Sequence, residues 1–408
     1  CSYDILIAMF FCYLLLIYYI TKRIDCQSLL RQHETRRKTY MSENETTTFS
    51  SKCEILSDLW VSYRGDEGFD DFISYNDIGL PLTLLKLRST DRLAVVELGM
   101  NHPGETAQLA AIAQANIALI NNAQREHQEF MATVAAVAEE HSAAIKALPL
   151  NGVAVFPADS EFANVWREAA AGRKIMDFVL QSGSANDKAA VTGRLLNNGR
   201  VQVQAEQGAI EIQLNTLGSH NVRNALAASA VALAAGVSLE KIQQGLEAFT
   251  PVNGRMQAKP MDSNHTLIDD SYNANPDSVR AAIDALKLAG NGAWLVLGDM
   301  GEVGNQGPEF HREVGAYAAA QGIDKLFALG EQCQFAIAGF EDSKKTLSLT
   351  ASSQHFANMD LLISALRNDL QNQATHSSRH LNILVKGSRF MRMERVVQAL
   401  LEEAKACS

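Results

Sequence analysis

The chain has 408 residues, of which 47% are hydrophobic and 20% charged, and it carries 36 Lys and Arg against 46 Asp and Glu, a net charge of −10. This length allows two or three domains, each with its own core. The acidic balance argues against a nucleic-acid or anionic-membrane binder, which needs a basic surface. Its six cysteines form no close pairs, so we expect a reducing compartment and neither a disulfide framework nor a CxxC metal site. Because the sequence opens on Cys1, we expect that the natural start is missing.

The first part of the chain is an apolar run, residues 5–20 (ILIAMFFCYLLLIYYI), followed by Lys22 and Arg23. A bilayer-spanning helix needs roughly 20 apolar residues, so the run fits a membrane segment, a signal-like segment or a buried helix. Residues 21–71 are polar and show no period of 2 or 3.6, which is typical of a linker or a disordered segment.

After residue 72 the pattern becomes that of an α/β protein. Apolar runs at 93–99, 117–123 and 152–159 predict parallel strands that are covered on both faces. Helices are predicted from Pro81 and over 132–148. Alternation over 189–217, with a turn at 197–199, predicts a small antiparallel meander. Helices over 221–235 and 238–249 follow.

A second α/β unit is predicted from about residue 254. Its strands are HTLIDD, AWLVLGD, KLFALG and LNILVKGS, and its helices span 277–289, 309–321, 359–370 and 393–404. This gives about 150 residues, a normal size for an open doubly wound sheet.

Glu97 and His127 each follow one of the first two predicted strands of the parallel sheet. Carboxyl ends of parallel strands meet at one edge, where ligands bind. A carboxylate and an imidazole there could hold a divalent cation that bridges nucleotide phosphates. The alternative is that Glu97 caps the following helix and that His127 is a surface residue.

A second group of polar residues lies at the start of the helix predicted from residue 221. His220, Asn221 and Asn224 lie at its start, and an Asn side chain can both donate to and accept from an adenine edge. Alternatively, Ser219 or Asn221 is simply the N-cap. Arg255, after a turn, suits a phosphate by its fork geometry.

Further polar groups follow strands of the second unit. Asp270 could hold ribose hydroxyls, and Tyr272, Asn273 and Asn275 a base or a phosphate, although turn chemistry explains the same residue types. Two later strand ends offer groups that could bind a zwitterion or could be capping residues: Asp299, Glu302, Lys386, Ser388 and Arg389.

Taken together, these segments resemble the Mur ligase family of peptidoglycan synthesis. The resemblance rests on NDIGLPLTLL, ELGMNHPGE, NNAQREHQEF, LGSHNVRNALAA, VNGRMQ, IDDSYNANPDS, LGDMGEVG, FHREVG and VKGSRFMRME, in the family's order from about Asn76 to the C-terminus. It implies an α/β fold: an incomplete central domain of parallel sheet plus meander, followed by a Rossmann-like C-terminal domain.

The resemblance also implies an activity. ATP phosphorylates the peptide carboxylate of UDP-N-acetylmuramoyl-tripeptide, and D-alanyl-D-alanine attacks the acyl phosphate to form an amide. Catalysis is then expected of His127, Arg255 and Lys386, and Mg²⁺ binding of Glu97 and His127. The residues expected to contact ATP are His220, Asn221, Asn224, Arg255, Asp270, Tyr272, Asn273 and Asn275.

Three departures from the family pattern are visible. The family has a Gly-Lys-Thr phosphate loop after the first strand of the central domain, and no G-K-T or G-K-S occurs in these 408 residues. The family's N-terminal domain is not recognisable in residues 1–70. A family lysine that is carbamylated falls at or near His141, which we expect to be a helix-surface histidine or a neighbour of the metal ligands.

We therefore expect a cytoplasmic, monomeric ligase of this type with no nucleic-acid partner, inactive in this chain because the phosphate loop is missing. The alternative is a non-catalytic Mur-like binding protein, anchored to a membrane through residues 5–20. A folylpolyglutamate- or cyanophycin-type relative is disfavoured by the C-terminal motifs. The expected division is an unmatched segment 1–71, a truncated ATP-binding domain 72–252 and a C-terminal domain 253–408.

Overall fold

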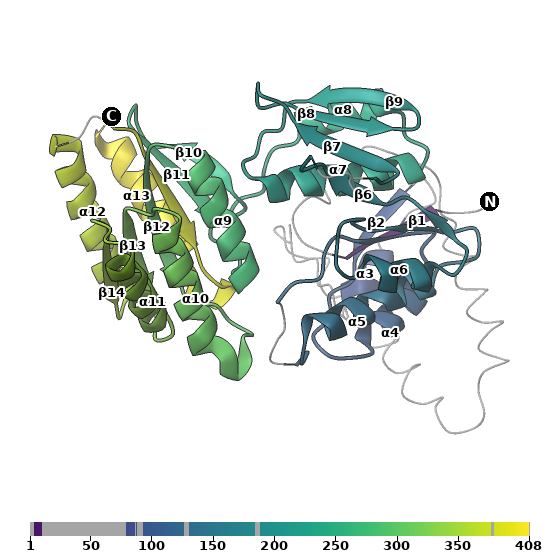
Figure 1. Ribbon diagram of the computed structural model, residues 1–408, viewed down its shortest axis with the longest axis horizontal. Coiled ribbons are helices and arrows are strands. Elements are labelled where there is room, and N and C mark those ends of the chain that lie inside the picture. The colour runs from purple at the N-terminus through teal and green to yellow at the C-terminus, as the bar shows by residue number, and fades with distance from the viewer. Residues whose placement is uncertain are drawn as a thin grey trace, which may run out of the picture.

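The computed structural model describes residues 4–9, 79–85, 87, 93–125, 130–183, 188–376 and 379–407. These residues form three sheets and the helices that cover them (Figure 1). We refer to residues 79–248, together with 4–9, as the central domain and to residues 257–407 as the C-terminal domain.

The first sheet of the central domain is parallel, with the strand order β2-β1-β3-β4-β5. The residues of β3 and β4 are all buried, which explains their continuous apolar sequences. Its strands are β1 (Asp4–Met9), β2 (Leu93–Glu97), β3 (Ile117–Ile120), β4 (Val153–Val155) and β5 (Lys174–Ile175). Its helices are α3 (Gly79–Leu85), α4 (Glu105–Ala113), α5 (Val134–Lys146) and α6 (Ala163–Ala170).

The start of the apolar run forms β1, an interior strand of this sheet between β2 and β3. Asp4 pairs with Leu93 on β2, and Leu6 pairs with Ile117 on β3. The sequence interpretation of residues 5–20 as one membrane, signal or buried-helix segment is therefore wrong for its first residues, and residues 10–20 lie outside the described part. Among the described residues, no helix is both long and apolar enough to span a bilayer.

The second sheet has the order β6-β7-β8-β9 and contains the predicted meander. Gly199 has a φ of 77° in the turn between β7 and β8, a conformation that glycine adopts without strain. A Cβ on Gly193 of β7 would overlap Leu226, so this strand lies directly against the Ala-rich α7. The elements are β6 (Phe178–Leu180), β7 (Val191–Leu195), β8 (Val201–Ala205), β9 (Gly208–Ile212), α7 (Ser219–Ala234) and α8 (Leu239–Ala248).

The C-terminal domain contains the third sheet, ordered β10-β11-β15-β12-β13-β14, in which only β10 is antiparallel. Its strands are β10 (Gln257–Pro260), β11 (His265–Asp270), β12 (Gly292–Gly298), β13 (Lys325–Leu329), β14 (Ser352–Phe356) and β15 (Leu381–Lys386). Its helices are α9 (Pro276–Leu288), α10 (Gly307–Ala320), α11 (Cys333–Thr346), α12 (Met359–His376) and α13 (Glu394–Cys407).

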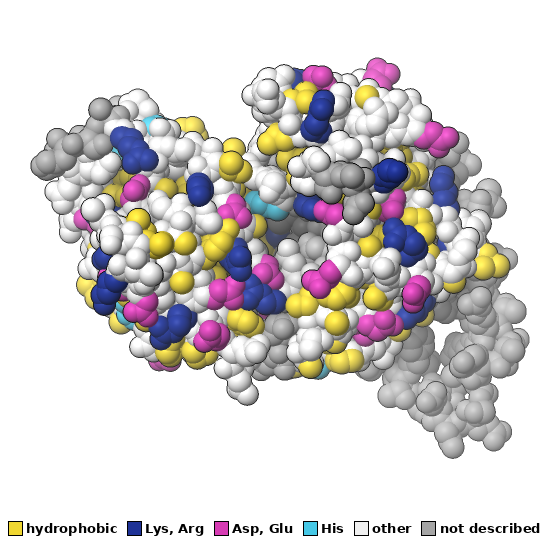
Figure 2. All heavy atoms as spheres, viewed as in Figure 1, with side chains coloured by type: hydrophobic (Ala, Val, Ile, Leu, Met, Phe, Trp, Pro, Cys, Tyr) yellow, Lys and Arg dark blue, Asp and Glu magenta, His cyan; other side chains and the backbone are white. Residues whose placement is uncertain are grey.

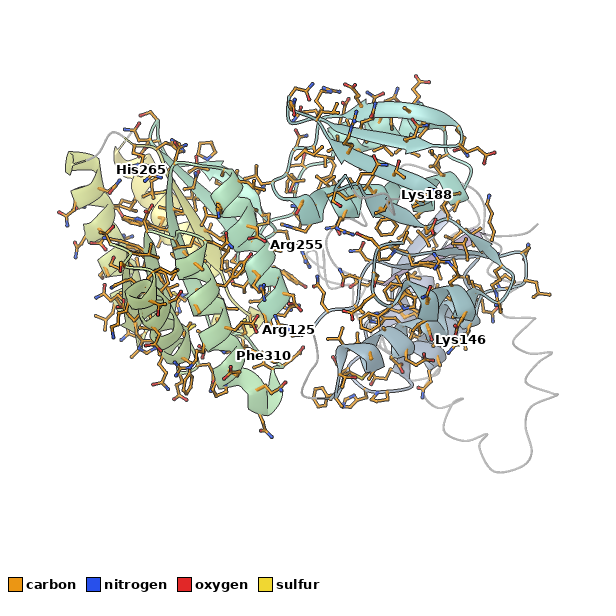
Figure 3. The ribbon with its side chains drawn as sticks, viewed as in Figure 1. Arg125, Lys146, Lys188, Arg255, His265 and Phe310 are labelled. Atoms are coloured by element: carbon orange, nitrogen blue, oxygen red, sulfur yellow. The ribbon has the colours of Figure 1, made fainter. Side chains whose placement is uncertain are left out.

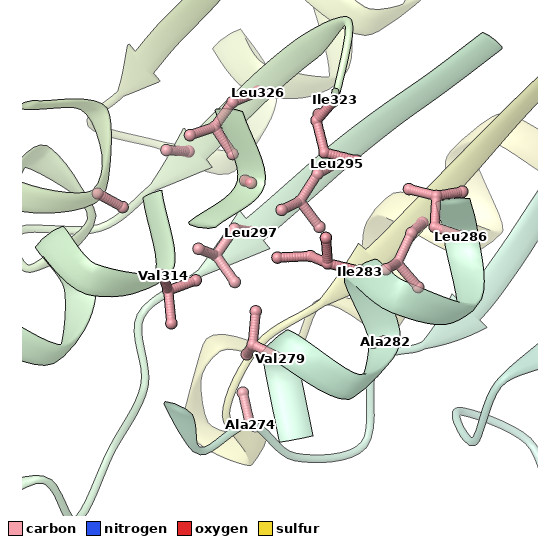
Figure 4. Packing of buried hydrophobic residues seen from close by; sticks show 14 of the residues in the cluster. Ala274, Val279, Ala282, Ile283, Leu286, Leu295, Leu297, Val314, Ile323 and Leu326 are labelled. Carbon is pink, nitrogen blue, oxygen red and sulfur yellow. The ribbon is translucent and has the colours of Figure 1, made fainter. Parts of the chain in front are cut away.

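Helices cover both faces of this sheet. Leu295 and Leu297 of β12 pack under α9 and α10 (Figure 4), whereas Trp294 and Val296 of the same strand pack under α12 and α13. Successive side chains of a strand point to opposite faces, so a wholly apolar strand requires two apolar layers. The doubly wound C-terminal domain predicted from the sequence is thus confirmed.

Candidate functional site

Three loops meet at the carboxyl edge of the C-terminal sheet, where β11, β15 and β12 are neighbours. The buried Ser388, after β15, links them: its N–H donates to the carbonyl of Asp299, and its Oγ donates to the carbonyl of Ala274 at 3.0 Å. The same Oγ accepts from the Gly301 N–H at 2.7 Å. The predicted ligand-binding segments therefore form one connected surface, as expected for a parallel sheet.

Lys386 lies beneath this surface. Its Nζ donates to Asp270 Oδ2 at 2.6 Å and to the Asn273 carbonyl at 2.8 Å, and its side chain is only 5% exposed. Asp270 Oδ1 in turn accepts from the Met256 N–H at 3.1 Å. Lys386 thus holds the β11–α9 loop (residues 271–275) in place. Its catalytic role stays a prediction.

Two arginines lie over an aromatic ring on the β11–α9 loop. The guanidinium carbon of Arg255 lies 4.0 Å from the centroid of the Tyr272 ring, and that of Arg389 lies 5.8 Å from it. The Tyr272 N–H donates to the carbonyl of Gly254, whose φ of 77° allows this close approach. Stacked Arg and Tyr suit a planar or anionic ligand.

The last residue of the β11–α9 loop has a structural role of its own. Asn275 is the N-cap of α9: its Oδ1 accepts from the Ser278 N–H at 2.7 Å, and Ser278 Oγ accepts from the Asn275 N–H at 3.0 Å. Pro276 occupies the first helical turn. The turn-chemistry explanation weighed for this loop therefore holds for Asn275, while its nucleotide contact stays a prediction.

A chain of amides joins β3 to the start of α7. Asn121 Nδ2 donates to Asn224 Oδ1 at 2.8 Å, and Asn221 Nδ2 donates to the Leu217 carbonyl at 2.6 Å. The N-cap of α7 is Gly218, which makes no side-chain cap bond, so the assignment of Ser219 or Asn221 as N-cap is wrong.

His220 connects the two halves of the site. This half-buried residue of α7 interacts electrostatically with Asp270, Lys386 and Asp284 of the C-terminal domain. Burial lowers the pKa of His220, so its imidazole is neutral near pH 7 and can both accept and donate a hydrogen bond. Figure 2 shows the surface hollowed between the two domains, and Figure 3 shows Arg255 at this gap.

The predicted metal ligands lie at the carboxyl edge of the central sheet. Glu97 ends β2 and is half-buried, and Ala8 of β1 separates it from Leu119 of β3. The loop after β3 therefore starts about two strand spacings, roughly 10 Å, from Glu97. His127 lies outside the described residues, so the metal pair stays a prediction.

Helix α5 differs from a second expectation, which concerned His141. Glu140 of α5 accepts from the N–H groups of Gly104 and Thr106 at 2.9 Å each, which caps α4. His141, expected on the helix surface, is 0% exposed. His141 and Ser142 are both polar, so the sequence predicted an exposed face here. In the structure both residues of this Ala-rich helix are buried.

A buried polar cluster was not expected from the sequence. Asp299, His311 and Cys333 have ligand atoms within 4.8 Å of one another. The Asp299 carboxylate accepts from the Cys333 N–H at 2.7 Å, and His311 Nε2 accepts from the Met300 N–H at 3.0 Å. Backbone groups therefore engage Asp299 and His311, which fix the loop after β12 to α10 and α11. A zwitterion contact by Asp299 has no support in this arrangement.

Comparisons with known proteins agree with this architecture. The Mur ligase middle domain matches residues 45–232, and the Mur ligase glutamate ligase domain matches residues 254–389. A UDP-N-acetylmuramoyl-tripeptide--D-alanyl-D-alanine ligase of Haemophilus influenzae is 35% identical over 81% of this chain and 69% of its own length. The Escherichia coli ligase of the same name is 34% identical over 80% of this chain and 69% of its own length.

Solved structures of the same family are also similar to this chain. A crystal structure of MurF from Acinetobacter baumannii has a TM-score of 0.73 and 29% identity, covering 98% of this chain and 76% of that chain. MurF from Thermotoga maritima in complex with ADP has a TM-score of 0.67 at 21% identity, covering 89% of this chain and 79% of that chain, a likeness of fold alone. The chain therefore belongs to the Mur ligase family, and within it the chain is similar to the UDP-N-acetylmuramoyl-tripeptide--D-alanyl-D-alanine ligases.

Proposed function

We propose that this chain has the binding surfaces of an ATP-dependent ligase that adds D-alanyl-D-alanine to UDP-N-acetylmuramoyl-tripeptide, but that these 408 residues do not transfer phosphate. The activity of the relatives supports the first half. The residues that follow β1, where the family has its phosphate loop, support the second half.

The hollow between the domains supplies groups that fit ATP. Asp270 offers a carboxylate oxygen of the kind that binds ribose hydroxyls, and Arg255 beside Tyr272 offers a cation and a ring. His220, on the other side, is a neutral imidazole that can exchange hydrogen bonds with a base. Both domains contribute, so closing them would also shield an acyl phosphate from water.

A magnesium ion would neutralise the charge of ATP phosphates in such a site. Glu97 is half-buried at the carboxyl edge of the central sheet, and an oxygen ligand there suits Mg²⁺. His127, in the loop after β3, is the second proposed ligand.

The observation that carries the proposed loss of activity is the identity of β1. The first strand of the central sheet is Asp4–Met9, and the sequence that follows it is Phe10-Phe11-Cys12. A phosphate loop needs consecutive backbone N–H groups on a glycine-rich turn and a lysine for the β- and γ-phosphates. No Gly-Lys-Thr or Gly-Lys-Ser occurs in the chain, so we expect ATP to bind without being cleaved.

The test is release of inorganic phosphate from ATP by the purified 408-residue chain, with Mg²⁺, UDP-N-acetylmuramoyl-tripeptide and D-alanyl-D-alanine. The Escherichia coli ligase serves as the positive control. We expect no release above the rate without enzyme, while circular dichroism and binding of a fluorescent ADP analogue report a folded chain. Substrate-dependent turnover would overturn the proposed loss, and a folded chain that binds no nucleotide would overturn the proposed binding surfaces.

The remaining proposals concern organisation. We propose a cytoplasmic monomer without a nucleic-acid partner, in which the second expected boundary separates the central domain from a C-terminal domain 253–408. Segment 1–71 is not proposed as a separate unit, because its strand β1 (Asp4–Met9) pairs within the central sheet and the Mur ligase middle domain matches from residue 45. The net charge of −10 supports the absence of a nucleic-acid partner. The change from the β6–β9 sheet to the sheet that begins with β10 supports the second boundary.

A further inference from the structure

Arg125, in the loop after β3, makes a set of ion pairs between the two domains. Its Nη2 donates to Asp277 Oδ1 at 2.6 Å, and its Nη1 donates to Glu313 Oε2 at 2.6 Å. The backbone N–H of Arg125 also donates to Asp277 Oδ2, at 2.9 Å. Asp277 lies in the first turn of α9 and Glu313 on α10, so one central-domain residue binds two helices of the C-terminal domain.

The surroundings of Arg125 favour this pairing. Its guanidinium lies 5.2 Å from the centroid of the Phe310 ring, and its side chain is 20% exposed. Arg280 also donates to Glu313, at 2.7 Å. The hydrogen bonds from Arg125, and then those from Arg280, lower the pKa of Glu313, so the carboxylate stays charged at neutral pH. Figure 3 shows Arg125 and Phe310 close together at the gap between the domains.

A second, apolar contact joins the same helix to the central domain. A Cβ on Gly218, before α7, would lie 3.0 Å from Ala285 Cβ of α9, and Leu217 packs against the C-terminal core. Asp277 and Ala285 are eight residues apart, which is about 12 Å along a helix. Two contacts separated along one helix fix its direction as well as its position.

The ion pairs lie next to both halves of the site. Asp277 is two residues beyond Asn275, where the β11–α9 loop ends, and Arg125 is two residues before the predicted metal ligand His127. We propose that Arg125 is a positioning residue that holds the start of α9 against the loop after β3 and so maintains the observed arrangement of the two domains without a ligand. The inference concerns domain geometry and is independent of whether the chain turns over ATP.

The backbone bond of Arg125 provides a direct readout. Because the N–H of residue 125 donates to Asp277 in its own right, its exchange with deuterium reports domain separation even after the side chain is removed. In Arg125→Ala we expect exchange at residue 125 and in the first turn of α9 to become about 10- to 100-fold faster, the range for losing hydrogen bonds between charged groups. Small-angle X-ray scattering of the ligand-free chain should show a larger radius of gyration.

Matched variants separate positioning from general damage. Arg312→Ala removes an exposed arginine of α10 that pairs with Asp342 inside the C-terminal domain, and it should change neither readout. The charge exchange Arg125→Glu with Asp277→Arg should restore slow exchange in α9 relative to Arg125→Glu alone. If Arg125→Ala does not fold, the double variant Asp277→Asn, Glu313→Gln tests the same contacts.

Two results would overturn the proposal. One is unchanged exchange and radius in the folded Arg125→Ala chain, or in the neutral double variant. The other is an equal effect of Arg312→Ala, which would mean that any loss of charge on these helices opens the molecule.

Discussion

Lys386 and Asp270 are directly paired residues at the ends of adjacent parallel strands, β15 and β11, and their side chains form an ion pair of 2.6 Å. Asp270 is 13% exposed and Lys386 5%, so water screens the pair little. The same lysine holds the Asn273 carbonyl. The strand ends and the loop that follows are therefore joined by one buried cation.

Removing this cation is expected to destabilise the C-terminal domain. Lys386→Met leaves the Asp270 carboxylate buried without its charge partner, which costs about 3–5 kcal/mol. Unfolding by urea, followed by circular dichroism, measures the loss. Lys344→Met, which removes a lysine paired with Glu341 across one turn of α11, is the control and should cost about 0–1 kcal/mol. Equal losses in the two variants would contradict a special role for the buried pair.

The stability of the chain should fall in mild acid because of buried histidines. Burial lowers the pKa of His311, whose Nε2 accepts from Met300 and whose Nδ1 lies 2.7 Å from the Gly307 carbonyl. The unfolded chain then binds the proton more readily, so the free energy of unfolding decreases as pH falls below about 6.5.

The pH dependence can be assigned by substitution. His311→Gln keeps a donor and an acceptor but does not titrate, so its free energy of unfolding should change less between pH 7 and pH 5. Denaturation curves at a series of pH values provide the comparison. An identical slope in the variant would show that other groups, such as His220, cause the dependence.

Because α10 and α11 pack closely, adding one methyl group at their contact is expected to lower the stability of the chain. A Cβ on Gly315 would overlap the Ala336 carbonyl, and a Cβ on Gly339 would overlap the Arg312 carbonyl. Gly315→Ala must therefore push the helices apart, at a cost of about 1–3 kcal/mol despite alanine's higher helix propensity. Thermal unfolding measures it, with the exposed Gln334→Ala on α11 as control. A stabilised Gly315→Ala would contradict the observed packing.

The backbone of β1 is expected to be essential to the central domain. Ile7 pairs with Val96 on one side and Ala118 on the other, so its N–H lies within the ladder. Ile7→Pro removes that donor and leaves a neighbouring carbonyl unpaired, which costs about 2–3 kcal/mol. Ile7→Val, which keeps the N–H, should have the wild-type unfolding midpoint within a few degrees. If the proline variant were as stable as the valine variant, β1 would not be part of the sheet.

The sequence predicted the strands of the C-terminal domain well because two-sided burial makes them continuously apolar. It did not predict α11 (CQFAIAGFEDSKKT). This helix has two small residues at its contact with α10, Ala336 and Gly339, and lacks a strong apolar stripe. Nor did it predict β14, an edge strand with exposed polar residues. The local pattern therefore fails for a helix that is selected by close backbone packing and for an edge strand that has no apolar face.

The sequence predicted the candidate site residues one at a time, and the structure shows which of them lie together. The grouping of Asp270, Tyr272 and Lys386 follows from parallel strand ends and was accessible from the sequence. The role of Arg125 was not, because it depends on how two domains pack, and a loop arginine has no local signature. The burial of His141 was missed for a related reason: an Ala-rich helix gives little indication of which face is inside.

The position of β1 inside the sheet, between β2 and β3, also determines the order in which the chain can fold. Its partners lie far along the sequence, since Asp4 pairs with Leu93 and Leu6 with Ile117. During synthesis the strand emerges before its partners, and the first of them, Leu93, follows 89 residues after Asp4. An apolar segment must stay unpaired throughout that time, and contacts of such long separation form slowly. The chain is therefore expected to depend on chaperones that bind apolar segments until the sheet closes around its first strand.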